Sequence, residues 1–310
     1  MRGFLSWSVV SGVLNTMVAL AAPFLYAALG ETFAQTSGVV NLGVDGIMLL
    51  SAFAAFYAAL ATGSLWLGVL AAALVGLGMG LLMSLVSVTL KAEQGVSGIG
   101  LYMFGLGLSS LLFKVLVGTV KTVEGFKPLP IPLLSRIPFV GPVFFREDIL
   151  TYGAFLLVPA SWWLLEKTSL GLKIKAVGQN PAAADSVGIG IDRIRYFAVC
   201  LGAVLAGLAG ASLSIAQLDL FQDNLTAGQG FIAVALVYFG GWKPAGVLAG
   251  ALIFSVANSF QLWMQVLGAK VPPSLAVMLP YALTILALTI TANRARQPAA
   301  LNKPFERGES

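Results

Sequence analysis

Long apolar runs with almost no charged side chains make up most of this sequence. Charged residues are 10% of the chain, whereas soluble domains contain about 25%, and the mean hydropathy is +0.91. A soluble fold of this composition would lack the polar groups needed to cover its surface. Because a helix of about 20 apolar residues crosses the hydrocarbon core of a bilayer, the chain is predicted to be an all-α integral membrane protein, a polytopic helical bundle.

The apolar runs predict about eight or nine transmembrane helices, together with broken or re-entrant segments. Residues 30–37 are polar and separate the first crossing from a run at 38–45 that is interrupted by Asn41, Gly43 and Asp45. A second run, 230–239, is too short to cross upright. Such discontinuous segments are common in transporters. The full crossings are predicted at residues 7–29, 47–61, 65–90, 96–118, 149–165, 195–215, 245–266 and 274–292.

Loop charges predict one transmembrane domain, residues 1–310, with two contrasting loops. Lys and Arg gather on the cytoplasmic side of membrane proteins, so the basic loop at 167–194 and the basic tail are placed in the cytoplasm. Counting crossings back from that loop places the N-terminus outside, and also the loop at 119–148 with its five prolines. The outer loop nevertheless holds basic residues that run against the charge rule, namely Lys121, Lys127, Arg136 and Arg146.

Small residues recur at every fourth position in two predicted crossings. They are Gly68, Ala72, Gly76 and Gly80 in one crossing, and Gly202, Ala206 and Gly210 in the other. Such a stripe lets a neighbouring backbone approach closely in lipid, so we predict a packing face on each crossing. The heptapeptide GVLAAAL at 68–74 returns as GVLAGAL at 246–252, which fits duplicated halves and also fits chance in so apolar a chain.

Residues 173–195 contain a short helix with its own start and stop signals, flanked by basic residues. Asn180 is a good N-cap, Pro181 suits the first helical position, and three alanines follow. Gly188 can adopt the left-handed conformation that ends a helix. The local sequence fits either an ordinary capped turn or a small-faced helix that packs into a groove of a partner.

The residue inventory excludes several kinds of chemistry. The chain has no His and a single Cys, so it has no Cys/His metal cluster and no His-based triad. It lacks the G-x-x-x-x-G-K-[ST] motif that binds ATP phosphates and any long Lys/Arg run for nucleic acid. Asp45 is the one clear carboxylate in the predicted crossings, which is little for an ion relay. We therefore expect no enzyme activity, no metal, no cofactor and no nucleic acid, and an energy source in another subunit.

Three stretches spread over the chain carry motifs of a known family. Residues 37–53 (SGVVNLGVDGIMLLSAF) resemble the pattern G-x-x-N-x-G-x-[ED]-G-x-M-L, with Asp45 where the family usually has Glu. Residues 176–189 (AVGQNPAAADSVGI) resemble V-G-x-N-x-x-A-A-x-x-x-G-I, and residues 230–254 resemble G-F-x-x-I-A-x-A-x-x-G-x-W-x-P. The family is that of bacterial ABC importer permeases of the branched-chain amino acid, ribose and nucleoside group. Within it the chain is most similar to nucleoside-type permeases that work with a basic-membrane-lipoprotein binding protein.

The resemblance implies a type II-like ABC importer permease in a bacterial cell membrane, with three kinds of protein partner. These are a second homologous permease, expected to form a heterodimer, a cytoplasmic ABC ATPase and an external substrate-binding lipoprotein. In such importers a cytoplasmic helix of the permease sits in a groove of the ATPase and transmits its closure. The residues that match this coupling loop are Gly178, Asn180, Pro181, Ala183, Ala184, Gly188 and Ile189.

Three polar residues and one aromatic residue are candidates for the substrate path. Asn15, Asn41 and Asn258 are polar side chains at membrane depth, where a polar group is costly unless it is paired. They could hydrogen-bond a nucleoside in transit or hold helices together, and Phe53 could stack on a base. Nucleosides are the expected small-molecule cargo, with simple sugars as the alternative. A stand-alone carrier driven by an ion gradient is a further alternative, although such a carrier has no reason to keep a capped coupling helix.

Overall fold

The computed structural model describes residues 7–132, 135, 137, 141–266, 278, 282, 289 and 297–306. Within these residues the protein is a bundle of helices without a named strand. Its α-helices are α1 (Trp7–Thr36), α2 (Val44–Thr62), α3 (Leu65–Ser84), α4 (Gln94–Leu116), α5 (Gly141–Phe144), α6 (Ile149–Lys167), α7 (Ser169–Gln179), α8 (Pro181–Ser186), α9 (Ile191–Ser212), α10 (Gln229–Phe239) and α11 (Pro244–Val266). Two π-helical turns, η1 (Leu85–Thr89) and η3 (Leu213–Gln217), extend α3 and α9.

Seven helices of the described part are long and apolar enough to cross a membrane. They correspond to seven of the eight predicted full crossings, so the expected all-α membrane bundle is confirmed. α10 is apolar but only 11 residues long, as its sequence predicted. The remaining predicted crossing, residues 274–292, lies outside the described residues apart from three isolated positions.

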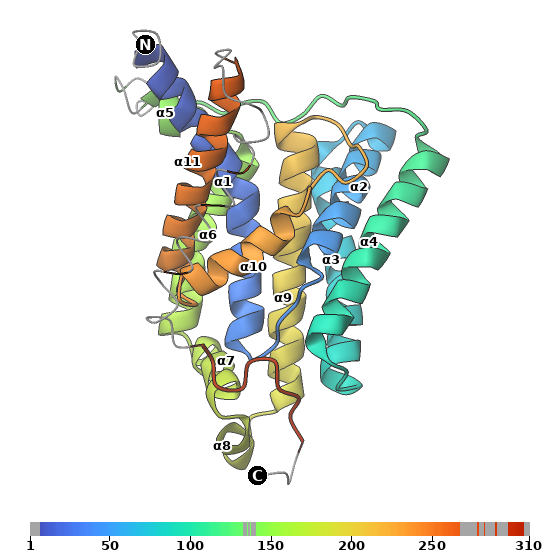
Figure 1. The fold of residues 1–310 in the computed structure, drawn as a ribbon, viewed down its shortest axis with the longest axis vertical. Coiled ribbons are helices and arrows are strands. Elements are labelled where there is room, and N and C mark those ends of the chain that lie inside the picture. Colours follow the sequence, from blue (N-terminus) through green and yellow to red (C-terminus); the bar gives the residue numbers. More distant parts are fainter. Residues whose placement is uncertain are drawn as a thin grey trace.

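Helix α9 is the centre of the bundle, and the other long helices pack around it (Figure 1). α1, α2 and α3 contact it directly, α4 lies beyond α2, and α6 and α11 lie on the other side of α1. The start of α1 and the short α5 lie at one end of the bundle, which we call the α5 end (Figure 1). α7, α8 and the C-terminal segment lie at the opposite end, which we call the α8 end.

The small-residue stripes form the seams of this bundle, as predicted. A Cβ atom added to Gly202 of α9 would lie 2.6 Å from the Gly30 carbonyl oxygen of α1. One added to Gly76 of α3 would lie 2.5 Å from the Ala203 carbonyl oxygen on another face of α9. Backbones therefore touch where side chains would otherwise separate them, which is how helices gain packing contacts in lipid.

Helix α1 is longer than the sequence predicted, because it continues through the polar residues 30–36. These residues are buried, and their polar side chains, except the Thr36 hydroxyl, have hydrogen-bond partners inside the bundle. The Thr32 hydroxyl donates to the Ala28 carbonyl oxygen at 2.7 Å, and Gln35 donates to the Glu31 carboxylate at 3.0 Å. Placing this stretch outside the first crossing was therefore wrong, since internal hydrogen bonds remove the cost of burying it.

Two further departures concern the α8 end. Residues 169–179, predicted as part of a basic loop, form the helix α7. α9 begins at Ile191, so Arg195 lies within the helix and its side chain is only 2% exposed.

The Pro-rich residues 119–132 run without regular structure across the α5 end (Figure 1). The Leu129 N–H donates to the Glu147 carbonyl oxygen at 2.9 Å, and the Ile131 N–H donates to the Phe145 carbonyl oxygen at 3.1 Å. Thr122 forms an isolated antiparallel bridge with Leu220. α5, which follows in the same connection, is an addition that the sequence did not predict.

The close approach of α1 and α9 is testable with one added methyl group. Gly202→Ala should push the two backbones apart and lower the stability by about 1–3 kcal/mol, as overpacking does. Gly100→Ala on α4 is the matched control, because a Cβ atom there meets nothing within 4 Å. Thermal unfolding in detergent micelles is the measurement, and equal melting temperatures for the two variants would contradict the packing.

Candidate functional site

The first of two breaks in the membrane-spanning helices lies at residues 37–43, between α1 and α2. This segment turns back along the last turns of α1, so that the Asn41 N–H donates to the Glu31 carboxylate at 2.9 Å. The Val40 N–H donates to the Gln94 side-chain oxygen of α4 at 2.8 Å. Non-helical backbone at membrane depth must find such internal partners. The predicted broken segment is confirmed, and it ends at Gly43, two residues before Asp45.

The second break precedes α10, which runs obliquely across the front of α9 in Figure 1. Asp219, Asn224 and Ala227 have positive φ angles of 57°, 56° and 46°. Such angles are uncommon outside glycine and cost energy unless the surroundings impose them. α10 then leads into a turn at Gly240 and Gly241, after which α11 runs back toward the α5 end.

The two breaks meet at Asp45, in the first turn of α2. One carboxylate oxygen accepts from the Gly230 N–H at the start of α10 (2.8 Å), and the other accepts from the Thr226 hydroxyl (3.0 Å). A Cβ atom on Gly230 would lie 2.3 Å from the Asp45 nitrogen. A fully buried carboxylate thus joins the N-terminal ends of two helices, which carry partial positive charge.

Glu31 is a second buried carboxylate within a span, and the sequence reasoning missed it. Its side chain is 2% exposed and binds the Asn41 N–H and Gln35. Gln35 in turn accepts a hydrogen bond from the indole N–H of Trp242 at 2.9 Å. The spacing of four residues between Glu31 and Gln35, typical of one helix face, was the available signal. The network links the first break to the turn after α10.

The four predicted path residues are not brought together. Asn15 donates to Glu147 at 2.7 Å near the α5 end. Asn41 is held at Glu31, 16 residues further along α1, which is about 24 Å at 1.5 Å per residue. The Asn41 side-chain oxygen accepts from the Gly43 N–H at 2.9 Å, so it orders the break. Asn258 is half-buried on α11, next to a serine that donates to the Val13 carbonyl oxygen.

Phe53 belongs to an aromatic group on the inner face of α2. Its ring stacks on Tyr57 with a centroid distance of 5.8 Å and an interplanar angle of 16°. It also meets the edge of Phe221 at 5.4 Å. Phe53 is buried and Tyr57 is half-buried, so Tyr57 is the more accessible of the two rings.

At the α8 end, the predicted capped helix is present as α8. The Asn180 side-chain oxygen accepts from the Ala183 N–H at 3.0 Å, Pro181 occupies the first helical position, and Gly188 has a φ of 83°. The N-cap, the helix and the left-handed stop are therefore confirmed. Because both ends are fixed, this short helix is held in one geometry despite its length.

The residues assigned to the coupling loop divide between two faces of the corner that α7 and α8 form. Ala183 is exposed, together with Ala182, Ser186 and Val187, and Val187 is 75% exposed. Ala184 faces the other way, into a small apolar cluster with Val177 and Ile191. Asn180 and Gly188 are exposed, whereas Pro181 and Ile189 are partly buried.

Gly178, at the end of α7, joins the corner to the first break. A Cβ atom on Gly178 would lie 1.9 Å from the Thr36 carbonyl oxygen, the last residue of α1. α7 therefore presses directly on the point where the broken segment begins. Any displacement of α8 that carries α7 with it must act first on Thr36 and the residues after it.

Comparison with known proteins identifies the family to which this architecture belongs. The family model described as branched-chain amino acid transport system / permease component matches residues 13–288. The chain belongs to this family. It is thus a permease subunit of an ABC transporter and a multi-pass membrane protein.

Individual relatives agree with this assignment. NupQ of Bacillus subtilis, a guanosine ABC transporter permease protein, is 36% identical over 97% of this chain and 98% of its own length. NupC of Lactococcus lactis, a nucleoside ABC transporter permease protein, is 33% identical over 93% of this chain and 94% of its own length. TsgC13 of Haloferax volcanii, provisionally named a glucose ABC transporter permease protein, is 37% identical over 86% of this chain and 82% of its own.

A solved structure supports the fold of the permease. It is an inward-facing transporter provisionally assigned to the metal-chelate type of ABC transporters. Its TM-score to this chain is 0.52 at 15% sequence identity, over 91% of this chain and 86% of that chain. In the described part of the permease, no group of three or more Cys, Asp or Glu side chains is placed to hold a metal ion.

The Asp45 junction is testable by comparing two substitutions. Asp45→Leu would leave the Gly230 N–H and the Thr226 hydroxyl without their acceptor, and each buried unpaired group costs about 1–3 kcal/mol. Asp45→Asn keeps one acceptor oxygen for Gly230, so the loss should be smaller. Thermal unfolding of the two purified variants measures the difference. Equal destabilisation would show that the hydrogen bonds do not hold the junction.

A buried carboxylate at the α5 end, Glu147, predicts that the stability of the permease depends on pH. Burial raises the pKa of Glu147 from 4.5 to about 8, and the neighbouring Asp148 adds to the rise. Because the folded state holds the proton more tightly, this contribution is complete below about pH 4.5 and is lost as the pH rises through about 8. The melting temperature should fall over this range.

Glu147→Gln should flatten that pH profile, since the amide can still accept from Asn15 and carries no charge. Glu124→Gln, which changes an exposed carboxylate of the same segment, is the control and should leave the profile unchanged. A wild-type profile that is flat between about pH 5 and 8 would contradict the assignment.

Proposed function

We propose that this permease is the membrane subunit of an ATP-driven importer of nucleosides in a bacterial cell membrane. Residues 167–194 then lie in the cytoplasm and residues 119–148 outside. α8 docks on a separate ATPase and transmits its closure to the broken segments. The single observation that supports this best is the corner of α7 and α8, where a capped helix with an exposed small face is pressed through Gly178 onto Thr36.

α8 can transmit a displacement because it is stiff. A flexible loop would absorb a displacement of its tip, whereas a helix fixed at both ends moves as one body. The Asn180 cap and the left-handed Gly188 supply that fixation. The exposed Ala182 and Ala183 let a partner surface approach closely, and the buried Ala184 keeps α8 attached to its own chain.

The energy source is proposed to be a separate subunit, because the sequence has no G-x-x-x-x-G-K-[ST] motif. The other proposed partners are an external substrate-binding lipoprotein and a second permease. The chain is similar to two different nucleoside permease proteins of one Lactococcus lactis strain, NupC and, over 31% of this chain, NupB. That pair supports a heterodimer of related permeases.

The proposed cargo is supported by the three relatives described above. Two are named for guanosine or nucleosides and one provisionally for glucose. A nucleoside and a simple sugar share a ring with several hydroxyl groups, so sugars remain the alternative cargo. Among the proposed path residues Phe53 has the best support, because the adjoining Tyr57 offers a half-buried ring on which a base can stack. Asn15, Asn41 and Asn258 are less well supported.

The docking role of α8 is testable at its exposed face. Ala183→Arg should leave membrane insertion intact, because the side chain points to solvent, but should lower the amount of ATPase that co-purifies and the rate of uptake by at least about tenfold, the effect of 1.4 kcal/mol. Ala183→Ser preserves the small face and is the matched control. Unchanged co-purification with Ala183→Arg would remove α8 from the interface.

Cargo and energy source can be separated in one uptake experiment. Proteoliposomes with the complete transporter and its binding protein should accumulate labelled guanosine only when ATP is supplied, with or without an ion gradient. Glucose and ribose serve as competitors. Inhibition by glucose but not by guanosine would favour the sugar alternative, and uptake driven by an ion gradient alone would favour a secondary carrier.

A further inference from the structure

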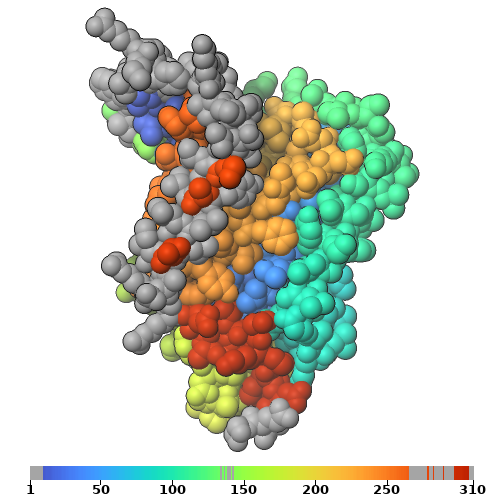
Figure 2. Space-filling view, viewed as in Figure 1, coloured from blue at the N-terminus to red at the C-terminus, as the bar shows by residue number. Residues whose placement is uncertain are grey.

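The C-terminal segment, residues 297–306, is packed against the α8 end of the bundle. In Figure 1 it crosses in front of the lower end of α9, and in Figure 2 it fills the space between α7–α8 and the end of α3–α4. The match to the family model ends at residue 288, before this segment begins.

The first half of the segment is hydrogen-bonded to the end of α7 and to the first break, which α8 is proposed to move. The Ala300 N–H donates to the Gly178 carbonyl oxygen at 2.9 Å, and the Asn302 N–H donates to the Gly38 carbonyl oxygen at 3.1 Å. Ala300 is only 6% exposed. Gly38 has a φ of 95°, and a Cβ atom on it would lie 3.1 Å from the Ala300 carbonyl oxygen. The segment thus ties the end of α7 to the start of the first break.

The second half reaches α8 itself and the loop before α4. The Phe305 ring packs against the apolar cluster of Val177, Ala184 and Ile191. Glu306 forms an ion pair with Lys91 at 3.0 Å. Both members of that pair are more than 40% exposed, so the pair contributes little. The apolar contact of Phe305 is the stronger attachment.

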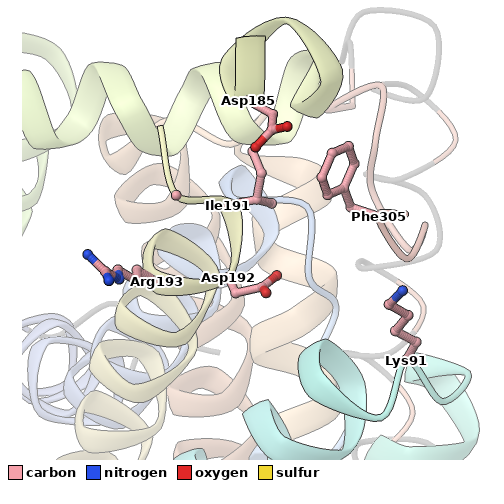
Figure 3. Close-up of a pocket in the computed structure, with 7 residues that line it drawn as sticks. Lys91, Asp185, Ile191, Asp192, Arg193 and Phe305 are labelled. Carbon is pink, nitrogen blue, oxygen red and sulfur yellow. The ribbon is translucent and has the colours of Figure 1, made fainter. Parts of the chain in front are cut away.

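A pocket of about 400 Å³ opens between this segment and the α8 corner. It is lined by Lys91, Asp185, Gly190, Ile191, Asp192, Arg193 and Phe305 (Figure 3). Figure 3 shows Phe305 facing Ile191 across the hollow, whereas Arg193 points to the opposite side. The pocket therefore adjoins α8 and would be missing a wall without the C-terminal segment.

We propose that residues 297–306 are part of the coupling apparatus: they complete the ATPase docking surface beside α8 and tie that surface to Gly38. This rests on the proposed function. α8 alone offers the ATPase six residues, and the end of α7 reaches the first break through Gly178, beside Thr36 and Gly38. The segment adds the wall of a pocket on the docking side and hydrogen bonds to Gly178 and Gly38 on the membrane side.

The physical consequence is that α8 and the first break move together. With the segment in place, a push on α8 reaches residues 36–38 through both the Gly178 contact and the Ala300 and Asn302 hydrogen bonds. Without it, α8 can tilt about the end of α7 while the break stays where it is. The segment should then matter for ATPase binding and transport more than for the stability of the isolated permease.

The test is truncation of the full-length permease after residue 296, in cells that also produce the other subunits of the same importer. The truncated chain should insert in the membrane and melt near the wild-type temperature, but co-purify with at least about tenfold less ATPase and import correspondingly less cargo. Truncation after residue 306 is the control and should behave as the wild type.

Two point variants keep the test decisive if the shortened chain fails to fold. Phe305→Ala removes the pocket wall and the contact with α8, and should lower ATPase co-purification and uptake. Phe104→Ala is the matched control: it removes a ring of the same size that is 50% exposed on α4 and does not line the pocket, and it should change neither. Wild-type co-purification and uptake with Phe305→Ala would overturn the proposal.

The outcomes also separate this proposal from the proposed function. If Ala183→Arg abolishes ATPase binding while the truncated chain binds and transports normally, the C-terminal segment is not part of the apparatus, although α8 is. If the full-length permease binds no ATPase at all, both proposals fail together.

Discussion

A bilayer interior offers no water to an unpaired peptide group, and the described structure depends on how this constraint is met at its two breaks. The backbone leaves helical geometry between α1 and α2 and again before α10. Each break is held by a buried carboxylate, Glu31 at the first and Asp45 where the two meet. These carboxylates bind backbone N–H groups, so they act as fixed partners of the chain itself. The positions of α2 and α10 follow from that junction.

The order of elements around the breaks is repeated. α2 is followed by a turn at Gly63 and then α3, and α10 is followed by a turn at Gly240 and Gly241 and then α11. The similar heptapeptides at 68–74 and 246–252 lie near the starts of α3 and α11. Each heptapeptide thus lies near the start of the helix that follows a glycine turn, and duplicated halves stay a prediction.

A series of close contacts connects the α8 corner to this junction. Gly178 meets Thr36, the Glu31 carboxylate of α1 binds Asn41 in the break, and the Asp45 carboxylate binds Gly230 on α10. The first contact joins two backbones and the two carboxylates are buried, so these contacts deform little under load. An ATPase acting on α8 would thus meet a continuous stiff connection that leads to the middle of the permease. The exposed face of α8 and the C-terminal segment lie at its outer end.

Much of the fold and of the α8 corner could be predicted from local sequence. The errors share one cause, which is that each depends on a contact between residues far apart in the chain. The crossings, the glycine stripes, the broken segments and the capped α8 all follow from patterns within a few turns of chain. The prediction ended α1 too early because Glu31 and Gln35 read as loop residues. It also could not tell that Ala184 faces its own chain while Ala183 faces solvent. It offered Asn15 and Asn41 for the substrate path, although Glu147 and Gly43 occupy their side chains.

The sequence by itself determined that the chain lies in a membrane, where its long apolar helices lie, how α8 is capped, and which helix faces are small. Only the tertiary structure decided which polar groups pair. Asn15 and Glu147 are 132 residues apart in the chain, Asp45 and Gly230 are 185 apart, and Gln35 and Trp242 are 207 apart. Helix periodicity and capping are local properties of a chain, whereas a buried hydrogen bond depends on which distant segment the packing brings alongside.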